Sequence, residues 1–374
     1  MEKWKDMETD LLVYGCALSK VFAYKCAAGR QLLEHFGGLA ALFAAGRKEL
    51  AAVMPGGARM IDQLLDPALL DWAAQEVEWA QTEGIRLLVI DQPGYPRRLA
   101  ACEDAPLLLY CKGTVDLDAP RALAVVGTRK ASWHGREACR RVVGALGDLA
   151  EKPLIVSGLA LGIDGCAHLT ALENGLATVA VLPCGLDEIY PRQHEELARR
   201  IAAHGALVSD FARGTAPVAF TFLRRNRIIA GLADATLLAE SYRRGGGLIT
   251  MQLASSYNRD TFAIPGRLSD ASFEGNNRLI AKQEAVLVAD EETIPVTLGW
   301  AEALCRQHRS PLLRPGDTPQ QRTALQLLQQ RGPLSVDAVA ALMSIGVDAA
   351  SVLLLELEMA GRVGGDGNNF FVSL

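Results

Sequence analysis

The sequence predicts an α/β fold built on a doubly wound, mostly parallel sheet. Short apolar runs recur through the middle of the chain, and each is continuous instead of alternating, as expected for strands buried on both faces. Helical patterns separate most of these runs, and alternating strands and helices favour parallel pairing through right-handed crossovers. The runs lie at 122–126, 154–157, 178–182, 206–209, 236–240, 261–265 and 285–289.

Helical patterns flank this region on both sides. Residues 10–76 alternate short helical patterns with glycine breaks, typical of a small helical domain, and 84–113 lead into the sheet through short apolar strands and proline-rich turns. After a polar, proline-containing segment at 306–319, three helical patterns end in a hairpin pattern with a glycine-rich tip, as in a winged helix. We therefore expect domains at 1–76, 77–295 and 319–374, with a linker at 296–318.

The helical pattern at 348–359 is the counterpart of a DNA-recognition helix in this C-terminal module. It carries Asp348, Glu356 and Glu358 and no basic residue. Because phosphate contacts are made largely by basic side chains, this charge favours contact with a protein over binding to a DNA backbone.

The composition limits the classes of function. A formal charge of −5 argues against a generally basic nucleic-acid binder, but it leaves room for a local basic patch. The charged start MEKWKDMETD lacks a signal peptide's apolar core, and no apolar run is long enough to cross a membrane, so we expect a cytoplasmic protein. The eight cysteines contain no C-x-x-C pair and do not cluster with the six histidines, so we expect no metal and no cofactor.

In an open parallel sheet, ligands bind beside the turns at the carboxyl ends of the strands. Several turns here combine glycines with hydroxyls or basic side chains, which suits a ligand with several phosphates. The candidate phosphate-binding residues are Gly127, Thr128, Arg129 and Lys130 (VVGTRKAS); Ser157 and Gly158 (SGLALGID); Arg192 (PCGLDEIYPR); Arg225, Asn226 and Arg227 (RRNR); and Arg244 and Gly246 (SYRRGGGLIT).

The segment RRNRIIAGL places three arginines directly before an apolar run. No acid occurs between Asp210 and Asp234 that could balance Arg224, Arg225 and Arg227. Because the apolar run fixes the helix close to the sheet, we expect unbalanced charge on a rigid element, as an anion site requires. Of the three, we expect Arg224 to be the one that faces solvent.

Other ligands and chemistries fit these turns less well. A dinucleotide site requires G-x-G-x-x-G, where VVGTRKAS has cations, and the P-loop motif is absent. The stretch GGGLIT resembles the helix opening of phosphoribohydrolases related to lysine-decarboxylase-like proteins, but Leu253 stands where their catalytic glutamate belongs. Ser157, Asp164 and His168 invite comparison with a catalytic triad, yet the G-x-S-x-G elbow is missing. We expect Asp164 to brace its helix and His168 to pack beneath the loop.

Several motifs occur in order at consistent spacing: IVSGLALGID followed by AH, VAVLPCGLDEIYP, RNRIIAGL and FAIPG. By these motifs the chain resembles the DNA-processing protein A (DprA/Smf) family, most strongly over residues 122–288 and back through YPRRLAACEDAPLLLY. The resemblance implies an extended Rossmann-like domain, with an N-terminal helical, SAM-like domain and a C-terminal winged helix as common additions.

The resemblance also implies a function. Proteins of the family bind single-stranded DNA, protect it during natural transformation and load the RecA recombinase on it; they form homodimers through the Rossmann domain and have no established enzymatic activity. Arg129 matches the family's DNA-contacting arginine, Arg192 matches the basic residue after YP, and the phosphate pocket maps to Ser157, Gly158, Arg225, Asn226 and Arg227. We therefore expect a non-enzymatic binder of single-stranded DNA, with a phosphoribohydrolase-like nucleotide-processing enzyme as the alternative.

The sequence departs from the family pattern at several positions. Leu161 stands where the family often has arginine, Thr128 replaces a serine, His194 an asparagine and Leu223 a proline. Arg243 or Arg244 could offset the arginine missing at position 161. A scaffold that binds a protein through its winged helix is a third interpretation that the sequence leaves open.

Overall fold

The computed structural model describes residues 7–300, 317–365 and 369–372. Its centre is a sheet of nine strands in the described part of the chain, in the order β1-β2-β6-β5-β4-β3-β7-β8-β9. The strands are β1 (Ile85–Val89), β2 (Leu108–Gly113), β3 (Ala122–Gly127), β4 (Leu154–Ser157), β5 (Thr178–Val181), β6 (Ala206–Ser209), β7 (Ala235–Glu240), β8 (Asp260–Ala263) and β9 (Val286–Leu287).

Every apolar run predicted as a strand is one, and strands β3 to β9 pair in parallel, which confirms the predicted fold class. Within this sheet, the antiparallel pairs are those of β1 with β2 and of β2 with β6, and both involve strands that precede the repeating region. Along β3, Leu123 and Val125 belong to one hydrophobic core, and Ala124 and Val126 belong to the other. Burial on both faces is the reason why these strands are continuous apolar runs.

The order of the strands reverses at β3. From this strand the chain adds β4, β5 and β6 on one side, then returns to place β7, β8 and β9 on the other. Thus β3 pairs with β4 through Ala122 and Leu154, and with β7 through Leu123 and Ala235. The crevice outside the carboxyl ends of β3 and β7 is therefore the topological switch point, where ligands of open α/β sheets bind.

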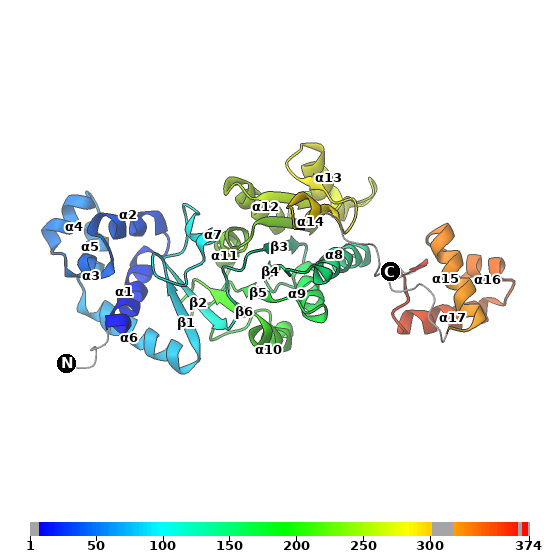
Figure 1. The fold of residues 1–374 in the computed structure, drawn as a ribbon, viewed down its shortest axis with the longest axis horizontal. Coiled ribbons are helices and arrows are strands. Elements are labelled where there is room, and N and C mark those ends of the chain that lie inside the picture. Colours follow the sequence, from blue (N-terminus) through cyan, green and yellow to red (C-terminus); the bar gives the residue numbers. More distant parts are fainter. Residues whose placement is uncertain (1–6, 301–316, 366–368, 373–374) are drawn as a thin grey trace.

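Helices cover both faces of the sheet (Figure 1). The helices α8 (Trp133–Ala145) and α9 (Ile163–Glu173) pack together on one face, and α11 (Ala219–Leu232) and α12 (Gly246–Ser256) pack together on the other. Ser132 caps α8 by accepting a hydrogen bond from the Gly135 amide at 3.0 Å. The other elements of this region are α7 (Arg97–Ala100), η1 (Leu146–Asp148), η2 (Arg192–His194), α10 (Glu195–His204), η3 (Ala271–Phe273), α13 (Glu274–Ala281) and α14 (Thr293–Thr297).

The N-terminal region is helical, as predicted, and it packs beside β1 and β2 (Figure 1). Its last helix continues to Thr82, so the boundary predicted after residue 76 falls inside a helix. These helices share one hydrophobic core with the sheet: Gly29 packs against Leu107, and Gly15 packs against Val89. The helices are α1 (Met7–Phe22), α2 (Cys26–Phe36), α3 (Leu39–Ala44), α4 (Arg47–Val53), α5 (Ala58–Leu64) and α6 (Pro67–Thr82).

The C-terminal module has the predicted three helices and hairpin, with a hydrophobic core of its own. They are α15 (Pro319–Arg331), α16 (Val336–Met343), α17 (Val347–Met359), β10 (Val363–Gly365) and β11 (Phe370–Val372). Most of the predicted linker and the tip of the hairpin lie outside the described residues. In the described part of the chain, no helix alone has the length and hydropathy of a membrane span; α16 and α17, bent by 111°, meet these criteria only when taken together.

Candidate nucleic-acid interface

A cavity of about 520 Å³ lies at the switch point, where the turn after β3, the turn after β7 and the first half of α11 meet. Three segments that were singled out in the sequence therefore converge in space. The candidate residues that line the cavity are Gly127, Thr128, Arg129, Arg225, Asn226, Arg244 and Gly246. The other candidates, Lys130, Ser157, Gly158, Arg192 and Arg227, are not among its lining residues.

The turn after β3 forms one wall of the cavity. Its first residue must be glycine because a Cβ on Gly127 would lie 2.5 Å from Ile163 Cγ1 and 3.0 Å from the Glu240 carbonyl oxygen. The Thr128 amide donates to that same carbonyl at 2.8 Å, which joins the turn to the end of β7. Arg129 and Lys130 are exposed, and neither has an ion pair with an acid in the described part of the chain. Both are therefore available to an anion.

The turn after β7 lines the cavity beside the turn after β3. Helix α12 begins at Gly246, and the first amides of a helix lack partners within it, so this end of α12 presents donors and a partial positive charge to the cavity. A Cβ at Gly246 would meet nothing within 4 Å, which shows that the space beside it is open. Arg244 lines the cavity, whereas Arg243 forms an ion pair with Glu274 at 3.6 Å. Of the two arginines expected to offset Leu161, Arg244 is the one placed to do so.

Arg225 supplies a buried positive charge to the cavity. Its Nη1 donates to the Val181 carbonyl at 2.9 Å, and its Nε has no hydrogen-bond partner. Burial is the main cause that lowers the pKa of Arg225 to about 10; the nearby Asp164 opposes this shift and Arg129 adds to it. The guanidinium is therefore still charged near neutral pH, and an anion in the cavity would offset part of the cost of its burial.

The turn after β4 supports Arg225; Ala160 of this turn lines the cavity, whereas Ser157 and Gly158 do not. Ser157 is fully buried, and its hydroxyl donates to the Val125 carbonyl at 2.6 Å. A Cβ on Gly158 would stand 1.5 Å from Arg225 Nη1. These positions argue against direct phosphate contact by Ser157 and Gly158, because the hydroxyl is already used and the glycine makes room for a guanidinium.

Asp164 and His168 do not form a triad with Ser157. The Asp164 carboxylate accepts a hydrogen bond from the Ala160 amide at 3.4 Å, and burial raises the pKa of this carboxyl group. His168 is fully buried, and its Nδ1 lies 2.7 Å from the Thr178 hydroxyl, which itself donates to the Ile155 carbonyl at 2.9 Å. Both side chains therefore have the bracing and packing roles predicted for them.

Arg224 and Arg227 face away from the cavity, and both are paired with Asp210. Arg224 donates to Asp210 Oδ2 from Nε at 3.0 Å and from Nη2 at 2.8 Å, and Arg227 Nη2 donates to the same oxygen at 2.6 Å. All three side chains are at most 8% exposed. The expectations of a solvent-facing Arg224 and of Arg227 beside phosphate are therefore wrong. The acid that balances them is Asp210, which follows β6 directly and stands at the start of the stretch without acids.

Two family models match this chain. The model described as DNA recombination-mediator protein A covers residues 86–299, which includes all strands of the sheet except the first residue of β1. The chain belongs to this family. The model described as the DprA winged helix domain covers residues 308–365, which confirms the prediction for the C-terminal module.

Relatives in the family extend this similarity over most of the chain. Protein Smf of Escherichia coli is 37% identical over 296 residues, which are 76% of each protein. The crystal structure of DNA processing protein A from Streptococcus pneumoniae covers 75% of this chain and 96% of its own at 32% identity, with a TM-score of 0.60. A structure of the Helicobacter pylori protein, described for its single-stranded DNA binding mode, covers 58% of this chain and 97% of its own at 28% identity, with a TM-score of 0.52.

The structure adds two aromatic side chains to the site of this family member. Phe222 lines the cavity, and the Arg129 guanidinium lies 4.6 Å from the centroid of its ring. Tyr190 meets the same ring edge-on at 5.4 Å. The pair holds the exposed Arg129 over the cavity rim. Phe222 was visible in the sequence only as an aromatic residue beside the arginines. Arg192 follows Tyr190 closely in the chain and is exposed on η2.

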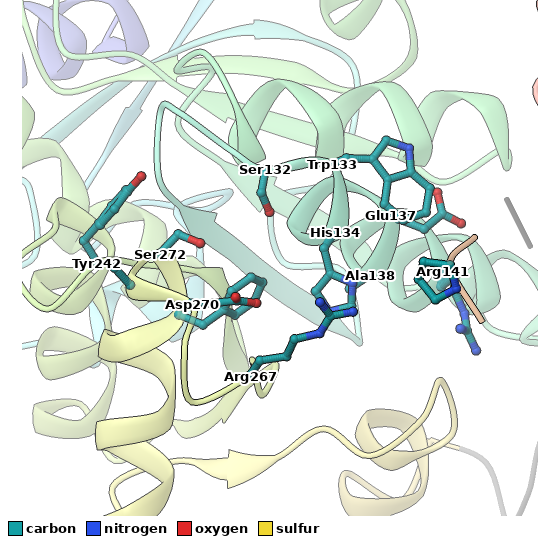
Figure 2. A pocket seen from close by; sticks show the side chains of 13 residues that line it. Ser132, Trp133, His134, Glu137, Ala138, Arg141, Tyr242, Arg267, Asp270 and Ser272 are labelled. Atoms are coloured by element: carbon teal, nitrogen blue, oxygen red, sulfur yellow. The ribbon is translucent and has the colours of Figure 1, made fainter. Parts of the chain in front are cut away.

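A second cavity, of about 650 Å³, lies between α8 and the segment around η3 (Figure 2). Although larger, it suits a polyanion less well, because the carboxylates of Glu137 and Asp270 line it and its Arg141 is paired with Glu291. Among the residues that line the switch-point cavity, Asp164 alone carries a carboxylate. Tyr242 lines both cavities and separates the two. The switch-point cavity is the candidate site on charge, despite its smaller volume.

Proposed function

We propose that this protein binds single-stranded DNA and holds the phosphates of the strand in the switch-point cavity. The observation that carries the proposal is the convergence of the Gly127 turn, the N-terminus of α12, Arg129, Arg225 and Arg244 on one cavity. Donors from helix ends and guanidinium groups match the several oxygens of a phosphate chain. The description of the Helicobacter pylori relative as a single-stranded DNA binder supports the same ligand.

The proposed mode of binding depends on phosphates and not on base identity. Contacts to phosphate give affinity and position without sequence preference, so strands of different sequence should bind alike. The net charge of −5 does not oppose this mode, because the field at the cavity is set by nearby Arg129 and Arg244 and not by the whole chain. Lys130 and Arg192, both exposed, would contact the strand beyond the cavity.

The proposed role of this binding is to protect a DNA strand taken up in natural transformation and to load the RecA recombinase on it. This part rests on the family resemblance, and the description of the matching model as a recombination mediator supports it. The same proposal includes a homodimer formed through the Rossmann-like domain and action in the cytoplasm. The acidic α17, which has no basic residue, fits a protein partner for the winged helix better than a second DNA contact.

The site is proposed to bind without catalysis. No acid occurs on α12, where the phosphoribohydrolase-like alternative needs its glutamate, and Leu253 occupies that position. The carboxylate of Asp164 accepts a backbone hydrogen bond and lies near Arg225. Incubation with nucleoside monophosphates, followed by chromatography for free base, separates the two functions: release of base at a rate proportional to protein would favour the enzyme.

The direct test of the proposed function is a gel shift with single- and double-stranded DNA of the same length, with and without RecA. We expect preferential binding to the single strand and faster assembly of RecA on strands that carry the protein. Equal binding to the duplex would contradict the proposed ligand. Preferential binding without any effect on RecA would contradict the proposed role and leave the ligand intact.

A further inference from the structure

Two exposed aromatic rings lie next to the switch-point cavity and take no part in its lining. Tyr24, between α1 and α2, is 71% exposed, and Phe220, in the first turn of α11, is 54% exposed. Their ring centroids are 5.5 Å apart with an angle of 52° between the planes. Exposed aromatic rings in contact carry a hydration cost that a stacked ligand would remove.

The rings are continuous with the cavity along the surface of α11. Leu223, which is 49% exposed, lines the cavity, and it is three residues from Phe220, so the two side chains are neighbours on the helix. A path of apolar surface thus runs from the cavity over Leu223 to Phe220 and on to Tyr24. It joins the N-terminal helices to the cavity, although these segments are far apart in the sequence.

Tyr24 is held in place by the buried ion pairs. The Arg224 guanidinium, fixed by Asp210, lies 4.8 Å from the centroid of the Tyr24 ring and 5.2 Å from that of Phe211. A ring already ordered by a cation loses little conformational entropy when a ligand stacks on it. Arg224 and Arg227 share the single carboxylate of Asp210, so the cluster behind the ring keeps a net positive charge, which favours a polyanion over a neutral partner.

We propose that Tyr24 and Phe220 are a stacking platform for bases of the strand whose phosphates occupy the switch-point cavity. This inference rests on the proposed function and adds a contact to the bases of the strand to the proposed contact with its phosphates. Aromatic rings bind unpaired bases of any identity through their π faces, and adjacent cations neutralise the backbone, as in other binders of single strands. In a duplex the faces of the bases are stacked on one another, so the platform selects for the single strand.

The test compares an oligo-dT strand with an abasic strand that has the same number of phosphates, in fluorescence anisotropy titrations. The wild type should bind oligo-dT more tightly. A double variant, Tyr24→Leu with Phe220→Leu, should lose this preference, with oligo-dT affinity falling roughly 5- to 150-fold for each stacked base lost. Its affinity for the abasic strand and its salt dependence should match the wild type. Both side chains are exposed, so the fold should tolerate leucine.

Three controls make the result decisive. Tyr24→Phe keeps the ring and should bind as the wild type does, and so should Met359→Ala, which removes an exposed apolar side chain of α17. Arg129→Ala should weaken binding to both strands. Wild-type base preference in the double variant overturns the platform, while the Arg129→Ala result decides separately whether the phosphate site stands. A double variant that binds both strands as the wild type does but has a different oligomeric state in solution also overturns the platform, in favour of a protein contact.

Discussion

The guanidinium of Arg225 occupies the space that a side chain on residue 158 would fill. Its Nη1 donates to the Val181 carbonyl at 2.9 Å, and a Cβ on Gly158 would stand 1.5 Å from that nitrogen. The buried cation of α11 beside the candidate phosphate site thus packs against the turn that follows β4. Gly158 of the SGLALGID motif is required for this packing.

Gly158→Ala should therefore displace Arg225 and weaken DNA binding. Loss of a buried hydrogen bond from a charged group should lower the free energy of unfolding by about 1.5–3 kcal/mol. Oligo-dT affinity should fall at the same time, because the cation moves. Urea unfolding and anisotropy measure the two effects. Gly346→Ala is the matched control, since a Cβ there meets nothing within 4 Å and the φ of −66° is ordinary. A Gly158→Ala variant as stable as this control would contradict the packing.

Asp210→Asn should destabilise the fold strongly. The carboxylate accepts hydrogen bonds from Arg224 and Arg227, and its side chain is 1% exposed. Removing one member of a buried ion network leaves uncompensated charge, which costs about 3–5 kcal/mol of unfolding free energy. Urea unfolding measures the change. Glu196→Gln, which breaks the exposed pair with Arg199, is the control and should leave stability unchanged. Equal stabilities for the two variants would contradict the structural role of Asp210.

Arg227→Ala separates the two roles first assigned to the RRNR segment. If Arg227 contacted phosphate, as expected from the sequence, this change would flatten the salt dependence of DNA binding. Because Arg227 pairs with Asp210 and donates to Cys26 Sγ at 3.7 Å, we now expect lower stability with an unchanged salt dependence of the folded protein. Binding is to be measured at a temperature where circular dichroism shows the variant to be folded. A flatter salt dependence there would return Arg227 to the phosphate site.

His168 should make stability depend on pH in mildly acidic solution. Burial, with His194 and Arg225 nearby, lowers the pKa of His168 to about 3, whereas a histidine in the unfolded chain has a pKa of about 6.5. Between pH values of about 3 and about 6.5 the unfolded chain binds more protons than the folded one. The free energy of unfolding is therefore highest above this range and falls as the pH falls through it, by up to about 1.4 kcal/mol per pH unit. Urea unfolding between these limits measures the slope.

His168→Asn should reduce that slope, because asparagine keeps a donor for the Thr178 hydroxyl and does not titrate. His204→Asn, at an exposed position of α10, should leave the slope of the wild type. If both variants retain the full slope, other groups cause the acid sensitivity.

Local sequence predicted the strands well because each one is buried on both faces and reads as a continuous apolar run. The same logic placed the turns of Gly127 and Gly246 at one edge of the sheet, where the structure brings them together. Parallel strands put their carboxyl ends on the same side, so sequence spacing alone is enough for that inference.

The pairings that the sequence did not predict depend on contacts between distant segments. Asp210 follows β6 and pairs with two arginines of α11. The ring of Tyr24 contacts that of Phe220, although most of the sheet domain lies between them in the sequence. Helix α6 extends past residue 76 because Val77 and Ala80 are still buried, and no glycine or proline interrupts the helix before Thr82. Such contacts are set by tertiary packing, which leaves no local pattern for Arg224, Arg227 or Tyr24.

The central claim is that phosphates bind beside Arg129 and Arg244 at the switch point, and the salt dependence of oligo-dT binding tests it most directly. For a single strand, the logarithm of affinity falls with the logarithm of salt by about 0.7 per neutralised phosphate. Arg129→Ala and Arg244→Ala should each weaken binding equally for strands of different sequence and reduce that slope by about 0.7. The control is Arg199→Ala, at an exposed position of α10 that does not line the cavity. Wild-type affinity and slope in both variants would contradict the claim.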